Sequence, residues 1–355
     1  MAYRVIQWST GNVGRYALRG IIGHPDMELV GLWVSSGAKA GRDAAELCGL
    51  DEPTGVLASN DTDALLAMDA DAVCYTATGD LRPVEALQDM SAILASGKNV
   101  VSSSLVPLVH PAGALPDFTA PLEEACAKGK SSFFTSGIDP GFANDVLPLL
   151  LTGVSERIDT VRVQEVLNYA TYDQPEVLFE TMGFGKPMDH TPILLMPSVL
   201  SLAWGGTVRL LADGLGLTLD EIAETYEKRA ADETFTTKPG TVEKGTMAGL
   251  RFEVQGVVNG KPRVIVEHIT RMHNDVAPDW PAPPGKGGYR VIIEGSPNMT
   301  CELMLEGDGG DENSGGLIVT AMRLVNAIPA VVAAKPGLMS ALDLPPITGR
   351  GLVSI

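Results

Sequence analysis

Arg4-Val-Ile-Gln-Trp-Ser-Thr-Gly-Asn-Val-Gly-Arg15 is the stretch that decides the fold. The apolar run 5–8 predicts a short strand, and a helix is expected over 13–22. Between them lies a Ser-x-Gly-x-x-Gly turn, the glycine-rich spacing of a dinucleotide-binding fold with serine at its first position. The two glycines would let a diphosphate approach the backbone and let the helix pack on the strand, while the helix N-terminus offers N–H groups. The turn predicts a nicotinamide or flavin dinucleotide site formed by Ser9, Thr10, Gly11, Asn12, Val13 and Gly14.

Composition indicates a globular protein large enough for two domains. The chain has 355 residues, of which 45% are hydrophobic and 20% charged. Its net charge of −18 argues against a nucleic-acid partner. Its four cysteines lack Cys-x-x-Cys spacing, so no zinc site or disulfide framework is predicted. The chain starts on its first predicted strand, and the apolar segment 317–334 contains Arg323, Asn326 and Pro329, which is typical of a buried helix. We expect a cytoplasmic protein without a membrane partner.

Strand-like and helical patterns alternate through the first 145 residues. The expected strands are 5–8, 29–34, 55–57, 72–76, 100–103 and 133–135, and the expected helices are 13–22, 62–67, 83–95 and 116–128. Such alternation with short connections predicts an α/β domain, a Rossmann-like doubly wound parallel sheet. We assign residues 1–145 to this dinucleotide-binding domain.

The pattern changes after residue 145. Strands are expected at 159–169, 251–258, 263–271 and 289–294, with a hairpin turn at Asn259-Gly260. Helices are expected at 192–215 and 219–231, an irregular loop at 277–288 and a solvated acidic turn at 306–316. We expect residues 146–316 to form a mixed α+β substrate domain with an open antiparallel sheet. Residues 317–355 are expected to be a helical segment that packs back on the first domain.

The segment after the second predicted strand bears on the choice of coenzyme. A carboxylate usually holds the adenosine ribose of NAD at this point. Here Ser35 and Ser36 are followed by Lys39 and Arg42, with no acid before Asp43. Hydroxyls and cations suit a 2′-phosphate, so we predict a preference for NADP(H) over NAD(H). If the two cations are only solvated, NAD(H) would serve equally well.

Two further polar loops follow predicted strands. Thr76, Ala77 and Thr78 come after the fourth strand, and Ser102 and Ser103 after the fifth. Because loops at the carboxyl ends of parallel strands face the coenzyme crevice, we expect these residues to contact the nicotinamide ribose. The alternative is that both loops are ordinary polar turns.

Three segments together resemble a known family: the opening Gln7–Arg15, then Gly137-Ile-Asp-Pro-Gly-Phe-Ala-Asn-Asp145 and Asn326-Ala-Ile-Pro-Ala-Val331. Over essentially its whole length the chain resembles the dihydrodipicolinate-reductase-like superfamily, in the branch of 2,4-diaminopentanoate dehydrogenases and native amine dehydrogenases. The resemblance implies NAD(P)-linked oxidoreduction at carbon–nitrogen bonds and a homodimer formed through the open sheet. Within these segments, we expect Phe142 to contact substrate and Asn326 to contact the coenzyme.

The chain departs from the family pattern at two points. Dihydrodipicolinate reductases have a His-His-x-x-x-Lys segment, whereas this chain has only Asp189-His190-Thr191, which disfavours lysine biosynthesis. The amine dehydrogenase branch has a glutamate just beyond the fifth strand, where this chain reads Ser104-Leu105-Val106-Pro107. Another acid must then take its place, or the reaction differs.

Three residues are candidates for proton transfer or for holding a cationic nitrogen. Glu165 lies in a strand of otherwise apolar spacing, Asp139 follows the sixth strand, and His110 follows the loop after the fifth. Each has a structural alternative: a paired interior carboxylate, a turn cap and a packed histidine.

Substrate contacts are expected from Tyr169, which shares a strand face with Glu165, and from Met182. Met182, together with Phe184, Trp204 and Trp280, could line an apolar pocket, although core packing would account for all four. The histidines lack metal-ligand spacing to any acid, so no metal is predicted.

These features favour an NADP(H)-dependent oxidoreductase acting on small, mainly apolar amines and ketones, by reductive amination with ammonia and its reverse. Two alternatives stay open at this point. One is an NADPH-dependent carbonyl or imine reductase, which the missing glutamate favours. The other is a sensor that binds NADP without catalysis.

Overall fold

The computed structural model describes residues 2–79 and 82–353, and it divides the chain into two compact units. Unit 1 combines Met1–Gly141 with Leu317–Ile355, and unit 2 is the continuous stretch Phe142–Gly316. The chain therefore leaves unit 1 once and returns to it.

Unit 1 is built on a parallel sheet of seven strands in the order β3-β2-β1-β4-β5-β6-β15. The predicted doubly wound fold is confirmed, because the strands β3-β2-β1-β4-β5-β6 lie in the order of a Rossmann domain. The added edge strand β15 pairs with β6 and was not predicted. The strands are β1 (Tyr3–Trp8), β2 (Met27–Trp33), β3 (Ala58–Ser59), β4 (Ala72–Tyr75), β5 (Asn99–Ser102), β6 (Ser132–Thr135) and β15 (Gly337–Met339).

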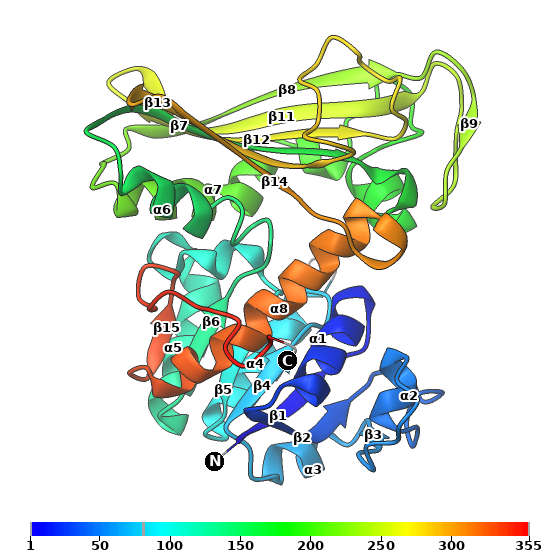
Figure 1. The fold of residues 1–355 in the computed structure, drawn as a ribbon, viewed down its shortest axis with the longest axis vertical. Coiled ribbons are helices and arrows are strands. Elements are labelled where there is room, and N and C mark those ends of the chain that lie inside the picture. The colour runs from blue at the N-terminus through cyan, green and yellow to red at the C-terminus, as the bar shows by residue number, and fades with distance from the viewer. Residues whose placement is uncertain (1, 80–81, 354–355) are drawn as a thin grey trace. The chain divides into compact units, whose positions relative to one another are not determined.

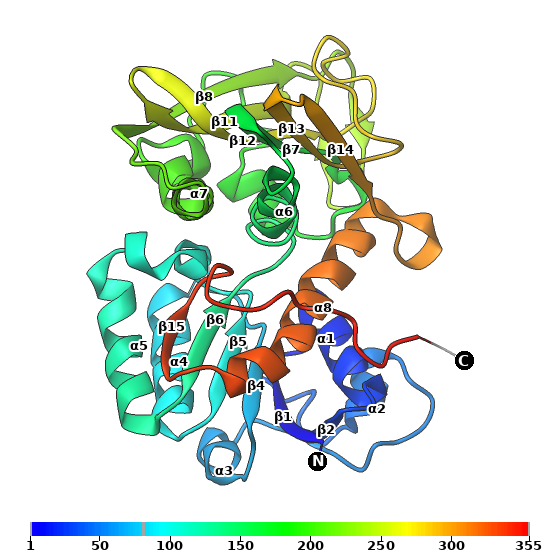
Figure 2. The same ribbon diagram turned by 60° about the vertical axis from the view of Figure 1, so that its left-hand side comes forward.

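Helices cover both faces of this sheet (Figures 1 and 2). One face packs against α1 (Asn12–Gly23) and the unit 1 part of α8 (Glu312–Ala333). The other face packs against α3 (Thr62–Ala67), α4 (Pro83–Ala95) and α5 (Pro116–Gly129). A short helix that was not predicted, α2 (Ala44–Cys48), packs beside α1. Burial on both faces explains why the strands read as continuous apolar runs.

Helix α8 is, in the described part of the chain, the one helix long and apolar enough by length and composition to span a membrane. Its side chains Leu324, Val325 and Ile328 are fully buried in the unit 1 core. Arg323 on the same helix is also buried, and its Nε donates to Ser136 Oγ over 3.3 Å. These contacts are those of a core helix. The helix begins at Glu312 rather than at residue 317, where it was expected.

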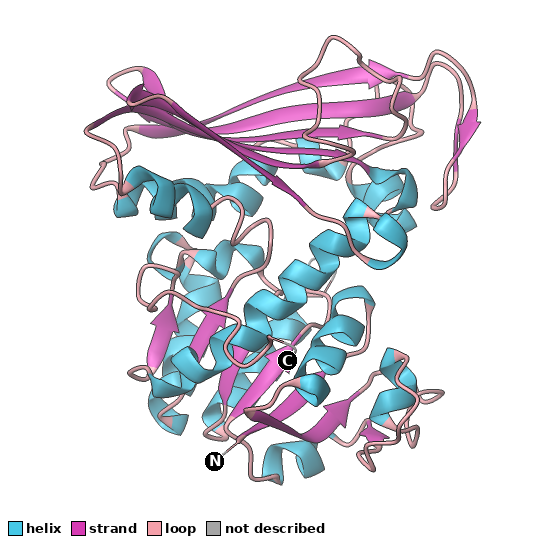
Figure 3. Ribbon diagram, viewed as in Figure 1, coloured by secondary structure: helices cyan, strands magenta, loops and turns pink. Residues whose placement is uncertain are grey.

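Unit 2 contains a six-stranded sheet in the order β14-β13-β7-β12-β11-β8. Figure 3 shows the strands of both units in magenta. All neighbours are antiparallel except β7 and β12, which are parallel, so the sheet is mixed rather than purely antiparallel. Its strands are β7 (Arg157–Asn168), β8 (Glu221–Ala230), β11 (Met247–Val258), β12 (Lys261–Arg271), β13 (Gly288–Ser296) and β14 (Met299–Met304); β9 (Phe235–Thr236) and β10 (Thr241–Val242) form a separate small ribbon.

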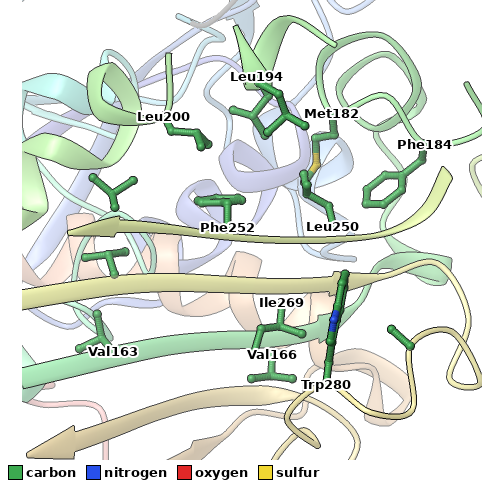
Figure 4. Packing of buried hydrophobic residues seen from close by; sticks show 14 of the residues in the cluster. Val163, Val166, Met182, Phe184, Leu194, Leu200, Leu250, Phe252, Ile269 and Trp280 are labelled. Atoms are coloured by element: carbon green, nitrogen blue, oxygen red, sulfur yellow. The ribbon is translucent and has the colours of Figure 1, made fainter. Parts of the chain in front are cut away.

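One face of the unit 2 sheet is covered by α6 (Val146–Thr152) and α7 (Val199–Gly214), and the other face carries no helix within the described residues of the unit. The core lies between helices and sheet, and Figure 4 shows Leu200, Leu194 and Phe252 gathered there. Short helical turns complete the connections: Val106–Val109, Pro111–Gly113, Tyr169–Thr171, Glu176–Thr181, Ile193–Leu195 and Asp308–Gly310.

The prediction of a helix over 219–231 is wrong, because Glu221–Ala230 forms the edge strand β8. Its glutamates, alanines and lysine are good helix formers. Pairing along the length of β11 outweighs this local preference of less than about 1 kcal/mol per residue. The helix expected over 192–215 starts at Val199, after a single turn at Ile193–Leu195.

Candidate functional site

The glycine-rich turn of unit 1 leaves no room for a side chain on its inner side. A Cβ placed on Gly14 would lie 2.4 Å from Ser9 O and 2.7 Å from Thr76 Oγ1. A Cβ on Gly11 would meet only Ser9 Oγ, at 4.0 Å, so that glycine borders open space. The first glycine of the pair therefore exposes bare backbone, and the second allows close packing of helix and strand. Both features fit a bound diphosphate.

The N-terminus of α1 is prepared for an anion. No side chain caps it at Gly11, and its first turn contains no acidic residue. The turn itself is fixed by Gln7, whose Nε2 donates to Ser9 O over 2.9 Å and to Thr76 Oγ1 over 2.8 Å. The Thr76 hydroxyl in turn donates to Trp8 O over 3.0 Å. An uncapped helix end next to an immobilised turn is the arrangement that holds phosphate groups.

The segment after β2 brings one cation to the glycine-rich turn. Lys39 Nζ donates to Thr10 Oγ1 over 3.0 Å and to Thr10 O over 3.2 Å. Arg42 instead pairs with Glu46 over 2.8 Å. The Asp43 carboxylate caps α2 and also accepts N–H bonds from Thr54 and Gly55. Those bonds, the one from Thr54 first, lower the pKa of Asp43.

The other predicted coenzyme residues of unit 1 take several positions. Ser35 and Ser36 are exposed beside Lys39. Ser102 Oγ accepts the Ser104 N–H over 2.9 Å, and Ser104 Oγ donates to Ala77 O, so the loops after β4 and β5 are joined. Thr78 and Ser103 lie in these two loops. Asn326 on α8 has a buried Oδ1 with no hydrogen-bond partner among the described residues, an acceptor that a coenzyme group could satisfy.

His110 and Asp139 also belong to unit 1. His110 is buried between two short helical turns, and its carbonyl accepts the Gly113 N–H over 3.1 Å. Asp139 lies in the tight bend after β6, where a Cβ on Gly141 would come within 2.2 Å of Gly137 O. The bend requires glycine at residue 141 because its φ is +148°.

Unit 2 contains a carboxylate held by three aromatic residues. Glu165 on β7 is buried, with 5% of its surface exposed. Its Oε1 accepts the Tyr169 hydroxyl over 2.6 Å, and its Oε2 accepts the Tyr289 hydroxyl over 3.0 Å. His268 Nδ1 lies 3.5 Å from Glu165 Oε1. We call these four residues the Glu165 cluster.

Strand register produces this cluster. Glu165 on β7 pairs with His268 on β12 and with Tyr289 on β13, so three neighbouring strands present these side chains on one face. The His268 ring stacks on Phe252 at 4.7 Å and meets the Trp204 ring of α7 edge-on at 4.6 Å. The cluster therefore lies on the face that α7 covers, where a carboxylate is shielded from water.

The structure brings Glu165 and Tyr169 together, as the shared strand face predicted, although Tyr169 itself lies just past the strand end. Tyr289 and His268 were not predicted as their partners. The sequence does not give the pairing register between distant strands. The apolar residues at alternate positions around Tyr289 and around His268 indicate only that these two side chains face inward. Met182 is packed in the unit 2 core. Phe142 is the first residue of unit 2, and its carbonyl accepts the Leu147 N–H.

Comparison with known proteins identifies relatives along the whole chain. Residues 142–351, more than half of the chain, match the 2,4-diaminopentanoate dehydrogenase C-terminal domain. An amine dehydrogenase from Streptomyces virginiae is 47% identical over 350 residues, covering 97% of each chain. A 2,4-diaminopentanoate dehydrogenase from Acetoanaerobium sticklandii is 26% identical over 251 residues, 70% of this chain and 66% of that one.

Solved structures show the same fold. The amine dehydrogenase from Mycobacterium smegmatis superposes with a TM-score of 0.78 at 20% identity, over 99% of this chain and 98% of that one. The structure of GenD2 from gentamicin A biosynthesis, in complex with NAD, gives a TM-score of 0.53 at 15% identity, over 96% of this chain and 90% of that one. The sequence relatives and the domain match lead to one conclusion: the chain belongs to the 2,4-diaminopentanoate dehydrogenase family of oxidoreductases.

Proposed function

We propose that this protein is an NADP(H)-dependent amine dehydrogenase that aminates small, mainly apolar ketones with ammonia and catalyses the reverse reaction. The observation that carries the proposal is the buried Glu165 carboxylate in its frame of two tyrosine hydroxyls and a histidine. The 47% identical relative, named an amine dehydrogenase, supports the reaction type.

A buried carboxylate suits chemistry at nitrogen because its oxygens only accept hydrogen bonds when ionised. Glu165 has lone pairs beyond those used by Tyr169 and Tyr289, and these could hold an ammonium or iminium N–H. We infer that Glu165 substitutes for the family's glutamate after the fifth strand, where this chain has Leu105, a buried residue with φ +57°. Tyr169 would hydrogen-bond the substrate, and Phe142 and Met182 would border it.

A bound nicotinamide would supply or accept the hydride, and the protein's part is to hold the reactants and move protons. The glycine-rich turn, from Ser9 to Gly14, would hold the diphosphate, and the loops after β4 and β5 together with Asn326 would hold the nicotinamide half. We keep Asp139 as a second candidate for orienting the nitrogen and His110 as a proton relay.

The preference for NADP(H) rests on the segment after β2. The Asp43 carboxylate is occupied by four hydrogen bonds from Ala45, Thr54 and Gly55, so it is committed to the local fold rather than to a ribose. Lys39 already lies at the glycine-rich turn, and Ser35 and Ser36 are exposed beside it. Arg42 would join a 2′-phosphate only by leaving Glu46.

Purified protein incubated with NADPH, ammonium and a panel of ketones tests the reaction. We expect NADPH oxidation that requires both ammonium and ketone, with the amine as product. Ketone-dependent oxidation that does not need ammonium would instead identify a carbonyl reductase, the alternative favoured by Leu105 at the family's glutamate position. Coenzyme binding without turnover on any substrate would identify a sensor.

Glu165→Gln tests the role of the carboxylate. The change keeps the shape but removes the charge, and we expect kcat to fall by roughly 100-fold or more with NADPH affinity unchanged. Glu294→Gln, at an exposed position of β13, is the matched control and should keep full activity. Unchanged turnover in Glu165→Gln would remove this residue from the mechanism.

The family resemblance also implies a cytoplasmic homodimer assembled through the open face of the unit 2 sheet. Light scattering of the purified protein at micromolar concentration should give twice the mass of the 37.4 kDa chain. A monomer at that concentration would contradict this assembly.

A further inference from the structure

We propose that Tyr289 is a positioning residue for the Glu165 carboxylate. It fixes Oε2 from within the sheet, so that Oε1 is the oxygen that meets the substrate nitrogen. This inference rests on the proposed amine dehydrogenase function, and it gives the two tyrosines of the Glu165 cluster different roles. Tyr289 acts through Glu165 and stays in place, whereas Tyr169 yields its position to the substrate.

The two tyrosines hold different oxygens of the carboxylate. The Tyr289 hydroxyl donates to Glu165 Oε2 over 3.0 Å, and the Tyr169 hydroxyl donates to Oε1 over 2.6 Å. The carboxylate group therefore cannot rotate without losing both hydrogen bonds. Each oxygen of an ionised carboxylate has lone pairs for more than one donor, so a substrate N–H can join or replace a tyrosine hydroxyl.

Tyr289 is held by the sheet itself. It pairs with Glu165 on β7 and with Leu303 on β14, so β13 has a neighbouring strand on each side at this residue. A Cβ on the preceding Gly288 would lie 2.4 Å from Leu303 O, so β13 and β14 approach closely here. Tyr289 is 4% exposed. Because Tyr289 and Glu165 are directly opposite each other on adjacent strands, the register of the sheet fixes their hydrogen bond.

Tyr169 is held less firmly. It lies in the turn Tyr169–Thr171, beyond the end of β7, and it is half-buried. Its ring packs against the ring of Tyr172 in the same connection, with the ring centres 4.9 Å apart. A ligand therefore reaches Oε1 by displacing one hydroxyl of a turn. Oε2, in contrast, is bonded to a residue of the sheet interior.

The histidine of the cluster is a fixed neighbour of Oε1. His268 Nδ1 lies 3.5 Å from this oxygen. Its ring stacks on Phe252 and meets Trp204 edge-on, so the imidazole stays in place when the Tyr169 hydroxyl moves. A nitrogen bound at Oε1 would then lie beside an immobile ring and a movable hydroxyl. Orientation of this kind affects the reaction step more than binding.

Matched tyrosine variants test this division of roles. Tyr289→Phe removes only the hydroxyl on Oε2, and we expect kcat for amination to fall at least tenfold while KM for ammonium stays within twofold. Tyr169→Phe removes the hydroxyl that bonds the bound substrate, and we expect KM for the ketone to rise at least threefold with a smaller fall in kcat. Tyr226→Phe, at an exposed position of β8, is the control and should keep full activity.

A double variant separates positioning from a purely structural role. If Tyr289 acts through the carboxylate, Tyr289→Phe should lower kcat less than threefold in a chain that already carries Glu165→Gln. A tenfold fall in that background would show that Tyr289 acts independently of Glu165 and would overturn the proposal. Unchanged kcat in the single variant Tyr289→Phe would do the same. Urea midpoints of both phenylalanine variants show whether the fold is retained.

Fluorine NMR tests the same arrangement without turnover. The chain contains seven tyrosines, and after replacement of all of them by 3-fluorotyrosine the phenylalanine variants assign the resonances of Tyr169 and Tyr289. Cyclohexylamine added to the protein loaded with NADP⁺ should move the Tyr169 resonance at least three times further than that of Tyr289. In Glu165→Gln the amine should move neither resonance.

The outcomes distinguish this inference from the proposed function. Ammonium-dependent turnover that Tyr289→Phe leaves unchanged defeats the inference alone, as does equal movement of the two resonances. Without ammonium-dependent turnover the proposed function fails, and the NMR comparison still decides which oxygen meets an amine. No response of either resonance to tens of millimolar cyclohexylamine would defeat the assignment of Oε1.

Discussion

At the scale of single residues, two glycines three positions apart have different tasks. Gly11 borders open space, and its φ of −74° and ψ of −162° suit any residue. Gly14 faces the Ser9 carbonyl at a distance that excludes a Cβ. We therefore infer that Gly11 is required because the coenzyme diphosphate approaches it from outside. Gly14 is required by the packing inside unit 1.

Alanine at each position separates the two tasks. Gly11→Ala should lower NADPH affinity at least tenfold and leave the urea midpoint unchanged, because its new methyl group meets only the coenzyme. Gly14→Ala should lower both, since the Ser9 backbone must shift. NADPH titration and urea unfolding measure the two effects. Unchanged NADPH binding in Gly11→Ala would contradict the predicted diphosphate position.

Lys39 offers a test of coenzyme choice, with Arg42 as its internal comparison. Lys39→Gln should reduce kcat/KM for NADPH about tenfold relative to that for NADH, the equivalent of about 1.4 kcal/mol from one lost charge-assisted contact. Arg42→Gln should have a smaller effect, because Arg42 is engaged by Glu46. Equal effects on both coenzymes would argue against a 2′-phosphate at Lys39.

The glycine-rich turn could be predicted from the sequence because its spacing is local. The Glu165 cluster could be predicted only in part. Glu165 and Tyr169 are four residues apart, so strand periodicity connects them. Tyr289 and His268 reach Glu165 through strand pairings that span more than a hundred residues. Such pairings depend on the assembled sheet and leave no local trace.

At the scale of elements, tertiary contacts decide whether a segment forms a helix or a strand when its local preference is weak. The helices 62–67 and 83–95 were predicted with the bounds that the structure has, since each begins at a capping residue or a proline. Strand β8 was predicted as a helix because its composition favours one and its pairing with β11 is not visible in the sequence. The parallel pairing of β7 with β12 escaped prediction for the same reason.

The contact between α4 and α5 depends on one glycine. A Cβ on Gly129, the last residue of α5, would lie 1.8 Å from Leu94 O of α4. Gly129→Ala should therefore lower the free energy of unfolding by about 1–3 kcal/mol through backbone displacement. Gly23→Ala at the end of α1 is the control, because nothing lies within 4 Å of its Cβ, and it should be neutral or slightly stabilising. Similar urea midpoints for both variants would refute this packing argument.

At the scale of the whole molecule, the four cysteines are free and unevenly distributed between the two units. Cys74 and Cys126 are buried in unit 1, where burial raises the pKa of Cys74 to about 12 and that of Cys126 to about 11. Cys301 in unit 2 is half-buried. Since only the thiolate reacts, the two buried thiols report on the opening of unit 1.

Alkylation at pH 8 checks this expectation. At that pH about a thousandth of the Cys126 thiols and fewer of the Cys74 thiols would be thiolates, given pKa values above 10. Iodoacetamide should therefore leave both unlabelled in the folded protein, and both should become labelled together as urea rises. Peptide mass spectrometry gives the labelling site by site. Labelling of either thiol well before the other would show that unit 1 does not open as one body.

The return of the chain to unit 1 has a consequence for synthesis. Unit 2 is continuous, whereas the unit 1 sheet receives β15 and α8 from the final part of the chain. Every residue of unit 2 thus leaves the ribosome before unit 1 has all its parts, although strand β1 of unit 1 emerges before unit 2. A nascent chain halted before Leu317 would display the apolar sheet surface that α8 later covers, a ready target for chaperones until translation ends.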